Sequence, residues 1–414
     1  SKYRRMKLEL SLVVQGCRLG VLTGLGKAGQ HSLEVPGCLL YTRCGTVPHL
    51  TQDTLHTLNN LPSCYACFNT AVDLFTGLHD TVLYCSLHDP ATSCPPGHIT
   101  NKTVSVWGSG GRIELTVAKF MALQKAVQPD LYQSMADGET WQINTSRKRV
   151  RKSVDRTLAH LDECLLLHHK TQELSGVEVL GVVEGGDVLE ERVRSARETA
   201  KRPVGGFCLD GLHTAAMEQH LRTQLITAII KELPEDKPRL LQGVGRPDEV
   251  LACVEAGVDL FESFFPFQVT ERGCALIFPF NITTDPEAAG TGVQAPPTGL
   301  CNGTDNPQEE QTKMTLFEIN LKDKRYRDDF SPLVEGCGCY CCRNHQRAYL
   351  HHLLVTNELL AGVLLMLHNT AHYCAFFTAL RGALASDKLD HLKKRVLEGP
   401  GKGMSGEGAG EKDG

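Results

Sequence analysis

The sequence predicts an α/β protein in which a TIM-like (β/α)8 barrel follows an N-terminal antiparallel β lid and precedes a C-terminal zinc-binding subdomain. Between residues 50 and 275, buried apolar strands alternate with helical segments, as in a parallel sheet covered by helices. Residues 6–45 instead alternate apolar and polar side chains between glycines, which is typical of short antiparallel strands. A dense cysteine cluster near the C-terminus indicates a metal site.

The composition fits either one large barrel or two ordinary domains. The 414 residues are 41% hydrophobic, which is enough for a substantial core. The formal net charge of −5 gives no overall attraction for nucleic acid, so a polyanion would have to bind a local basic patch. The 17 cysteines are mostly scattered among apolar residues, and the N-terminal residues lack the apolar segment of a signal peptide. We therefore expect a reducing, intracellular environment and a soluble chain.

The N-terminal lid is predicted from the segments L-E-L-S-L-V-V, R-L-G-V-L-T, H-S-L-E-V and C-L-L-Y-T. Among them, residues 24–29 match the G-x-G-x-x-G pattern of dinucleotide-binding loops. Such a loop holds phosphate at the start of a helix, whereas the residues that follow here indicate a strand and a turn. A glycine-rich hairpin is therefore the better interpretation.

The barrel is predicted from apolar segments that end in glycine or proline turns, at residues 104–111, 178–186, 204–212, 239–245 and 258–266. A helix is expected over residues 188–200, and another is expected to begin near Pro247 and Asp248. The recurrence of this pattern favours a closed barrel, in which functional groups lie at the C-terminal ends of the strands.

The predicted organisation has four parts. Residues 6–279 hold the lid and the main part of the barrel, and residues 280–313, poor in large apolar side chains, form a mobile insertion. Residues 314–398 hold the zinc-binding subdomain and the last barrel helices. Residues 399–414 are rich in Gly, Lys and Glu and are expected to form a disordered tail.

Cys337, Cys339 and Cys342 lie too close together in the chain to pair comfortably as disulfides. Thiolates packed so closely repel one another unless a cation lies between them, and Zn²⁺ with tetrahedral S and N ligands is the usual cation. We expect one structural Zn²⁺ per chain, which needs a fourth ligand. His368, at the end of the apolar run that follows, is the candidate. The competing histidines are His345, His351, His352 and His372.

The densest basic run, R-K-R-V-R-K, covers residues 147–152. It suits either a solvated helix start or a phosphate-contacting segment. The candidates for contact with RNA are Arg147, Lys148, Arg149, Arg151 and Lys152.

The barrel turns S-G-G, E-G-G, D-G-L and G-V-G, followed by C-x-C-x-x-C and a distant histidine, resemble the tRNA-guanine transglycosylase family. The resemblance covers about residues 6–395 and includes K-S-V-D-R-T-L, G-V-G-R-P-D-E-V, G-V-D-L-F-E and R-A-Y-L-H-H-L. It implies that Cys337, Cys339, Cys342 and His368 bind the metal and that Cys341 does not. It also implies cytoplasmic residence with peripheral attachment to the mitochondrial outer membrane.

Catalytic members of this family exchange guanine at the tRNA wobble position for a deazaguanine such as queuine. One aspartate attacks the ribose to form a covalent intermediate, and a second aspartate handles protons. Here Gly108 replaces the proton-handling aspartate, and Glu262 replaces the nucleophile with a side chain one methylene longer. The resemblance therefore implies a degenerate pocket. Its other members are Asp137, Glu184, Gly211 and Leu212.

These departures predict a non-catalytic subunit that forms a heterodimer with a catalytic queuine tRNA-ribosyltransferase subunit and helps to hold one tRNA. The zinc region is expected near the interface, as in the homodimers of the family. Two alternatives stay open. One is an active base-exchange enzyme that uses Glu262 with Asp137 as proton carrier, and the other is a zinc-dependent RNA-binding scaffold unrelated to queuine.

Overall fold

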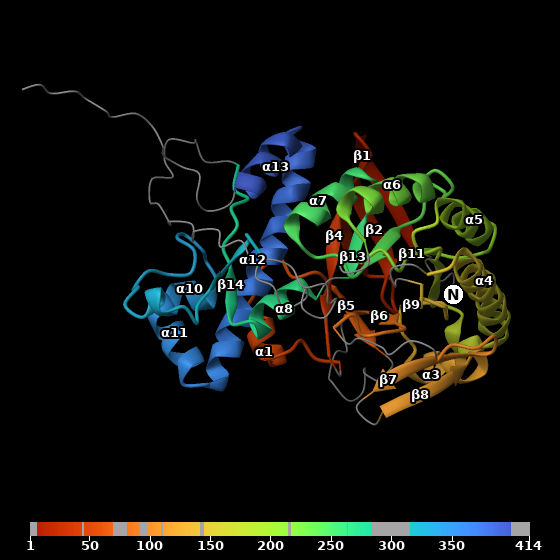
Figure 1. Ribbon diagram of the computed structural model, residues 1–414, viewed down its shortest axis with the longest axis horizontal. Helices are drawn as coiled ribbons and strands as arrows, with labels where there is room; N and C mark the ends of the chain where they lie inside the picture. The colour runs from red at the N-terminus through yellow and green to blue at the C-terminus, as the bar shows by residue number, and fades with distance from the viewer. Residues whose placement is uncertain are drawn as a thin grey trace, which may run out of the picture.

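The fold is that of a computed structural model of the chain (Figure 1). The structure describes residues 6–43, 45–68, 81–91, 98–108, 111–140, 145–213, 217–262, 264–282 and 315–398. Nearly all of the insertion predicted at 280–313, and the whole tail predicted at 399–414, lie outside these residues.

Eight parallel strands close into a barrel in the order β10-β11-β12-β13-β4-β5-β6-β9, which confirms the predicted fold class. The strands in chain order are β4 (Gly37–Tyr41), β5 (Cys64–Phe68), β6 (Val82–Ser86), β9 (Leu131–Gln133), β10 (Glu178–Val183), β11 (Gly206–Leu209), β12 (Arg239–Gln242) and β13 (Leu260–Glu262). The helices between and after them are α1 (Gln52–Leu55), α3 (Val117–Val127), α4 (Arg147–Lys170), α5 (Leu189–Ala200), α6 (Gln219–Ile230), α7 (Pro247–Glu255) and α8 (Phe265–Glu271), with a 3-10 turn at Gln172–Leu174.

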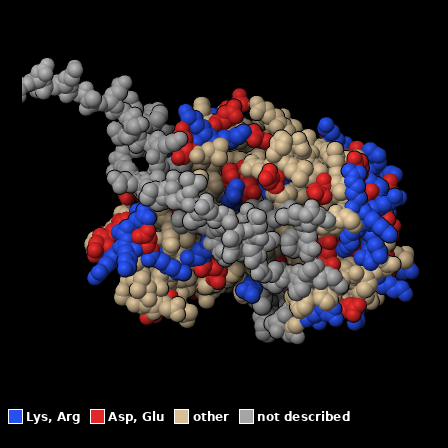
Figure 2. Space-filling model, in the orientation of Figure 1, with Lys and Arg blue, Asp and Glu red and all other residues tan. Residues whose placement is uncertain are grey.

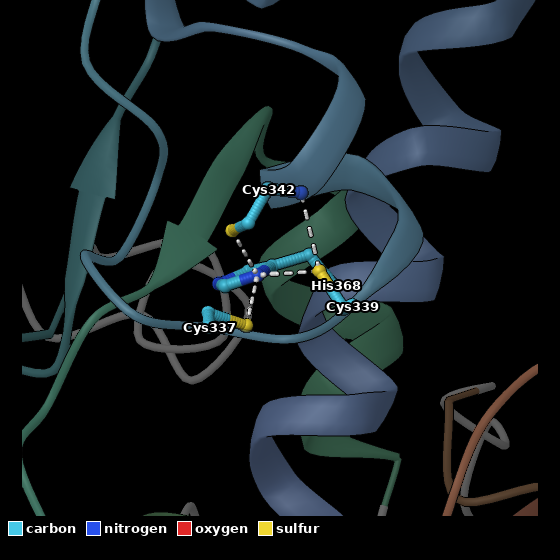
Figure 3. A group of neighbouring side chains, drawn as sticks. All are labelled: Cys337, Cys339, Cys342 and His368. Carbon is cyan, nitrogen blue, oxygen red and sulfur yellow. Dashed lines mark hydrogen bonds between the residues drawn. The ribbon is translucent and has the colours of Figure 1, made fainter.

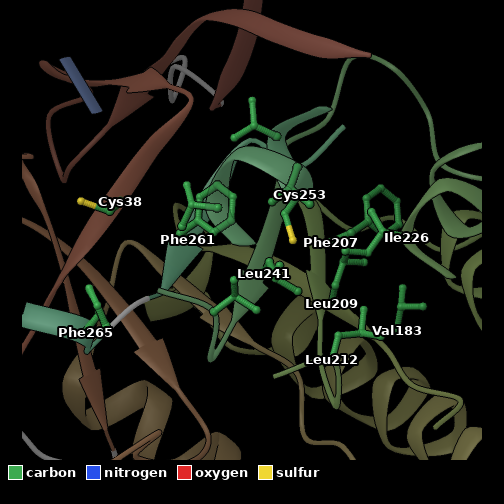
Figure 4. Packing of buried hydrophobic residues seen from close by; sticks show 14 of the residues in the cluster. Cys38, Val183, Phe207, Leu209, Leu212, Ile226, Leu241, Cys253, Phe261 and Phe265 are labelled. Carbon is green, nitrogen blue, oxygen red and sulfur yellow. The ribbon is translucent and has the colours of Figure 1, made fainter. Parts of the chain in front are cut away.

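Alternation along the strands decides which side chains enter the barrel. On β12 and β13, Leu240 and Leu260 belong to the interior cluster, whereas Leu241 and Phe261 belong to the layer that packs against the surrounding helices. Figure 4 shows this outer layer, where the strand residues meet Ile226 of α6. Because successive side chains alternate, the residues two positions after Leu240 and Leu260 also face inward, at the C-terminal ends of the strands.

The lid is a three-stranded antiparallel sheet of β1 (Lys7–Val14), β2 (Cys17–Leu25) and β3 (His31–Val35). The glycine-rich segment is a turn between β2 and β3, closed by a hydrogen bond from Gly29 N to Gly26 O of 2.9 Å, which confirms the hairpin. Leu22 and Leu33 pack with the interior barrel residues, including Leu260 at the start of β13. The lid therefore closes the N-terminal end of the barrel and leaves the C-terminal end for function.

The prediction that C-L-L-Y-T belongs to the lid was wrong. This segment is β4, a barrel strand that pairs in parallel with β13 and β5. All five of its residues are buried, because the strand is covered by the barrel interior on one side and by helices on the other. The local sequence of a short buried strand that follows antiparallel strands does not show which sheet the strand joins.

The segment at 104–111 was wrongly predicted to be a barrel strand. It forms β7 (Thr103–Gly108), which pairs antiparallel with β8 (Gly111–Thr116) as a separate two-stranded sheet. The residues after the turn, R-I-E-L-T, alternate in character and extend as a strand instead of starting a helix. The barrel strands β5, β6 and β9 were not predicted.

The C-terminal region packs against the side of the barrel. It contains α10 (Tyr340–Asn344), α11 (Arg347–Val355), α12 (Leu359–Ala385), α13 (Leu389–Glu398), the sheet of β14 (Cys274–Leu276) with β15 (Glu318–Asn320), and a 3-10 turn at Lys324–Tyr326. By length and hydropathy α12 could span a membrane, but 67% of its apolar window is buried in the fold, as in a core helix. In Figure 1, α10 and α11 lie on the opposite side of the barrel from α4.

Candidate metal centre and barrel pocket

The structure brings together the four side chains predicted to bind a metal. Their ligand atoms all lie within 4.8 Å of one another, and His368 Nδ1 faces the three sulfur atoms (Figure 3). The distances from this nitrogen to Sγ are 3.9 Å for Cys337, 3.5 Å for Cys339 and 3.4 Å for Cys342. A tetrahedral zinc with Zn–S of about 2.3 Å and Zn–N of about 2.0 Å would separate such ligands by about 3.5 Å. The donor set and its spacing therefore fit a tetrahedral metal ion.

Neighbouring elements orient these ligands. The Nε2 atom of His368 lies 2.8 Å from the Leu276 carbonyl oxygen, which accepts its proton and leaves the Nδ1 lone pair for the metal. The adjacent Asn369 accepts from Leu276 N and donates to Cys274 O, so α12 is held on β14. Cys339 caps α10, with its sulfur accepting a hydrogen bond from Cys342 N at 3.3 Å.

The remaining histidines have other environments. His351 Nδ1 lies 2.8 Å from the Leu321 carbonyl oxygen, and His345 stacks on Tyr349 with ring centroids 5.2 Å apart. His352 is exposed on α11. His372 contacts the Phe278 carbonyl oxygen at 2.9 Å, and burial beside His368 lowers its pKa to about 3. None of these histidines joins the sulfur cluster.

Cys341 points away from the cluster and into the apolar core of the C-terminal region. Burial raises the pKa of its thiol, which keeps the thiol protonated and unsuited to a metal. Cys341 is not part of the group of four ligand atoms, and its role as a non-ligand stays a prediction.

Glu262 lies at the C-terminal end of the barrel within a network of neutral polar groups. Its Oε2 accepts hydrogen bonds from Gln242 Nε2 at 2.7 Å and from Ser86 Oγ at 3.4 Å. Gln242 also donates to Gln133 Oε1 at 2.6 Å, and Tyr84 donates to the same oxygen at 3.1 Å. These residues end or nearly end β6, β9, β12 and β13, so barrel closure brings them together.

The environment of Glu262 suppresses its ionisation. The side chain is 1% exposed, and its Oε1 has no hydrogen-bond partner among the described residues. Burial raises its pKa to about 8, although the hydrogen bonds from Gln242 and Ser86 act in the opposite direction. At neutral pH the group is therefore mostly an uncharged acid, which is a poor nucleophile.

The other retained carboxyl group is held by arginines. Asp137 is fully buried and binds Arg149 through two hydrogen bonds, of 2.9 Å and 2.6 Å. Arg156 Nη1 adds a third, of 3.0 Å, to Asp137 Oδ2. Gly108 lies at the end of β7, opposite Gly111 of β8, and as a glycine it has no side chain.

Glu184, Gly211 and Leu212 follow the ends of β10 and β11. Glu184 is fully buried, and burial together with nearby Asp210 raises its pKa well above the usual range. Gly211 adopts a φ of +70°, and a Cβ there would lie 3.1 Å from an Arg192 guanidinium nitrogen. Leu212 is fully buried in the outer layer of the core.

Sequence reasoning missed the partners that decide the chemistry of these carboxyl groups. They are Ser86, Gln133, Gln242, Asp210 and Arg156. For Gln242, alternation along R-L-L-Q could have indicated an inward side chain, because Leu240 faces inward two residues earlier.

The basic run begins α4 and splits into two groups. Ser146 caps the helix, with its Oγ accepting a hydrogen bond from Arg149 N at 3.2 Å. The side chains of Arg147, Lys148, Arg151 and Lys152 are exposed and have no acidic partner within the described parts of the chain. Arg149 is instead occupied by Asp137. Figure 2 shows Lys and Arg gathered along the edge that α4 and α5 form in Figure 1.

Comparison with known proteins gives consistent matches over nearly the whole chain. The sequence model of one family, described as Queuine tRNA-ribosyltransferase, matches residues 15–401. A protein from Danio rerio is 70% identical over 95% of this chain and 99% of its own. A protein from Homo sapiens is 54% identical over 94% and 99%, and one from Ixodes scapularis is 37% identical over 88% and 93%. All three are named queuine tRNA-ribosyltransferase accessory subunit 2.

The cluster geometry predicts which cysteine the metal requires. Cys342→Ala should lose the metal and destabilise α10 and α12, because metal binding and folding are coupled at structural sites. Cys341→Ala removes a similar buried thiol outside the cluster and should keep the metal. Metal content by mass spectrometry, with thermal unfolding of both variants, checks this. Equal metal loss from both variants would show that the ligand set is wrong.

The raised pKa of Glu262 predicts a pH-dependent stability. Because the folded pKa of about 8 exceeds the ordinary value, the folded chain holds a proton that the unfolded chain releases, so stability is lost as pH rises toward 8. Glu262→Gln mimics the protonated acid and should remove this loss. The quantity to measure is the free energy of unfolding of Glu262→Gln minus that of the unmodified chain. We expect this difference to be larger at pH 8 than at pH 6 by about 1–3 kcal/mol. Urea unfolding at both pH values measures the difference, and an equal effect at both would contradict the assignment.

Proposed function

Because the chain belongs to the queuine tRNA-ribosyltransferase family, we propose that it is the non-catalytic subunit of a heterodimer that exchanges guanine for queuine at the tRNA wobble position. The name shared by the relatives, accessory subunit, supports this assignment. The catalytic partner supplies base exchange, and this chain completes the assembly and helps to hold one tRNA.

The state of Glu262 is the observation that carries the non-catalytic assignment. A carboxylate nucleophile must be ionised and free to reach the ribose carbon. Glu262 is instead uncharged at neutral pH and hydrogen-bonded to Gln242 inside the barrel. The second catalytic position is filled by Gly108, which has no group to donate or accept a proton.

The alternative of an active enzyme requires Asp137 as the proton carrier. Both carboxylate oxygens of Asp137 accept hydrogen bonds from Arg149, and one also accepts from Arg156. These three hydrogen bonds fill most of the acceptor positions of the Asp137 side chain. This arrangement argues against proton transfer through Asp137.

The two sides of the barrel suit two different tasks. We propose that the Cys3His cluster holds one structural Zn²⁺ that stabilises the region which contacts the catalytic subunit, since four protein ligands leave no open position for water. The exposed cations at the start of α4, on the opposite side, would bind tRNA phosphates. Cytoplasmic residence with peripheral attachment to the mitochondrial outer membrane completes the proposal and rests on the family resemblance alone.

The isolated chain should exchange no labelled base into tRNA and should trap no covalent tRNA adduct. In the heterodimer, Glu262→Gln should leave the exchange rate within about twofold, because the residue performs no chemistry. Loss of a positioned nucleophile or proton carrier would instead cost about 10²–10⁴-fold. The control is the corresponding change, Asp to Asn, at the nucleophilic aspartate of the catalytic partner. Abolished exchange with Glu262→Gln, while dimer formation and tRNA binding persist, would show that this chain is catalytic.

The exposed cations at the start of α4 should contact tRNA phosphates. The triple variant Arg147→Ala, Lys148→Ala and Arg151→Ala should weaken tRNA binding by the heterodimer and flatten its salt dependence by about 0.7–0.9 in log–log slope per lost contact. A matched triple, Lys388→Ala, Lys394→Ala and Arg395→Ala, removes the same charge from α13 and the residue just before it, and should have little effect. Measurements of tRNA affinity across salt concentrations test this. If the slope of log affinity against log salt is equal for both triple variants, residues 147–152 are only a solvated helix start.

A further inference from the structure

The first turns of α4 present two distinct faces. The exposed cations Arg147, Lys148, Arg151 and Lys152 share one side of the helix. The opposite side carries Arg149, Ser153, Arg156 and Thr157, whose spacing of three and four residues places them in a row along the helix. All four residues of this second row contact Asp137.

Asp137 binds this row with both its side chain and its backbone. The carboxylate accepts two hydrogen bonds from Arg149 and one from Arg156, over 2.6–3.0 Å. Asp137 N donates to Thr157 Oγ1 at 3.0 Å, and Ser153 Oγ donates to the Asp137 carbonyl oxygen at 2.5 Å. One fully buried residue therefore fixes about two turns of the helix to the loop after β9.

Arg156 extends this contact to the β7–β8 hairpin. Its Nε donates to Asn101 Oδ1 at 2.8 Å, and its Nη1 lies 3.5 Å from the Ile99 carbonyl oxygen, just before β7. Asp137 is thus the centre of a cluster that joins the barrel, the hairpin and α4.

The start of α4 needs such an anchor. Its first turn contains no acidic residue, and its exposed cations repel one another as well as the positive end of the helix dipole. An aspartate buried against the inner face offsets this repulsion without covering the outer face. The cations therefore stay both ordered and available.

We propose that Asp137 is a positioning residue for RNA binding, which holds the cationic face of α4 in a fixed orientation at the C-terminal end of the barrel. This inference rests on the proposed contact between α4 and tRNA. In this role Asp137 supports the contacts that α4 makes with the RNA backbone, and it does not recognise a base.

The sign of the effect of Asp137→Asn separates anchoring from simple electrostatics. Removing a negative charge near a cationic surface should tighten polyanion binding if charge alone matters. Loss of the anchor should instead weaken tRNA binding by the heterodimer by about three- to tenfold, because the phosphate-contacting cations lose their common orientation. Amide hydrogen exchange in residues 145–152 of the same complex should be at least about tenfold faster. The KM for tRNA should rise, and the KM for queuine should stay unchanged.

Two further variants keep the test independent of misfolding and of net charge. Arg149→Lys preserves the charge but loses the paired hydrogen bonds that a guanidinium makes, so it should reproduce the faster exchange and the weaker binding. Asp155→Asn is the matched control, since this aspartate is 57% exposed on α4 and pairs only with Arg194 among the described residues. It should change neither property.

The outcomes are distinct. Unchanged amide exchange in Asp137→Asn and Arg149→Lys would overturn the anchoring, and so would a raised KM for queuine with unchanged KM for tRNA. Faster exchange with weaker tRNA binding would support it. If the triple substitution of the exposed cations has no effect on tRNA binding, the RNA contact itself fails, and that result is obtained without any change at Asp137.

Discussion

The burial of carboxyl groups at the C-terminal end of a closed barrel is the constraint on which the functional site depends. A buried carboxyl group either finds a cationic partner or keeps its proton. Among the described residues, Glu262 accepts hydrogen bonds from the amide of Gln242 and the hydroxyl of Ser86 and meets no cation, and it is therefore mostly uncharged at neutral pH. Asp137, at the same end of the barrel, meets two guanidinium groups and forms ion pairs. The partners of each carboxyl group decide its role.

The barrel is closed, although Gly108 and Glu262 stand where the family resemblance implies two catalytic aspartates. The lid closes the N-terminal end with apolar side chains, and a network of hydrogen-bonded polar side chains lies at the other end. Gly108 is compatible with the hairpin, because its backbone pairs with Gly111.

The long helix α12 couples the metal cluster to the barrel. It carries His368, and it also packs against α8, β4 and β14. Asn369, the next residue, holds α12 on β14 through two hydrogen bonds to the β14 backbone, and it donates a third to Thr270 of α8. Any disturbance of the metal cluster is therefore transmitted along one rigid element to the barrel wall.

The sequence by itself determined the fold class and three members of the metal cluster, because those signals are local. Strand and helix periodicity repeats within about ten residues, and Cys337, Cys339 and Cys342 lie within one short segment. The same local signals misplaced β4 and β7, since a short apolar strand does not reveal which strand it will pair with.

Only the tertiary structure decided the chemistry of the pocket. The hydrogen bond between Ser86 and Glu262 joins residues 176 positions apart, and the bond between Gln133 and Gln242 joins residues 109 apart. Barrel closure makes these groups neighbours and excludes the water that would otherwise let Glu262 ionise. The pairing of Arg149 with Asp137 likewise appears only when α4 folds back over the end of β9, although the two residues are 12 positions apart. A pattern in the sequence shows which side chains are present. Their charge is set by burial and by their partners, and both depend on contacts that form only when the barrel closes.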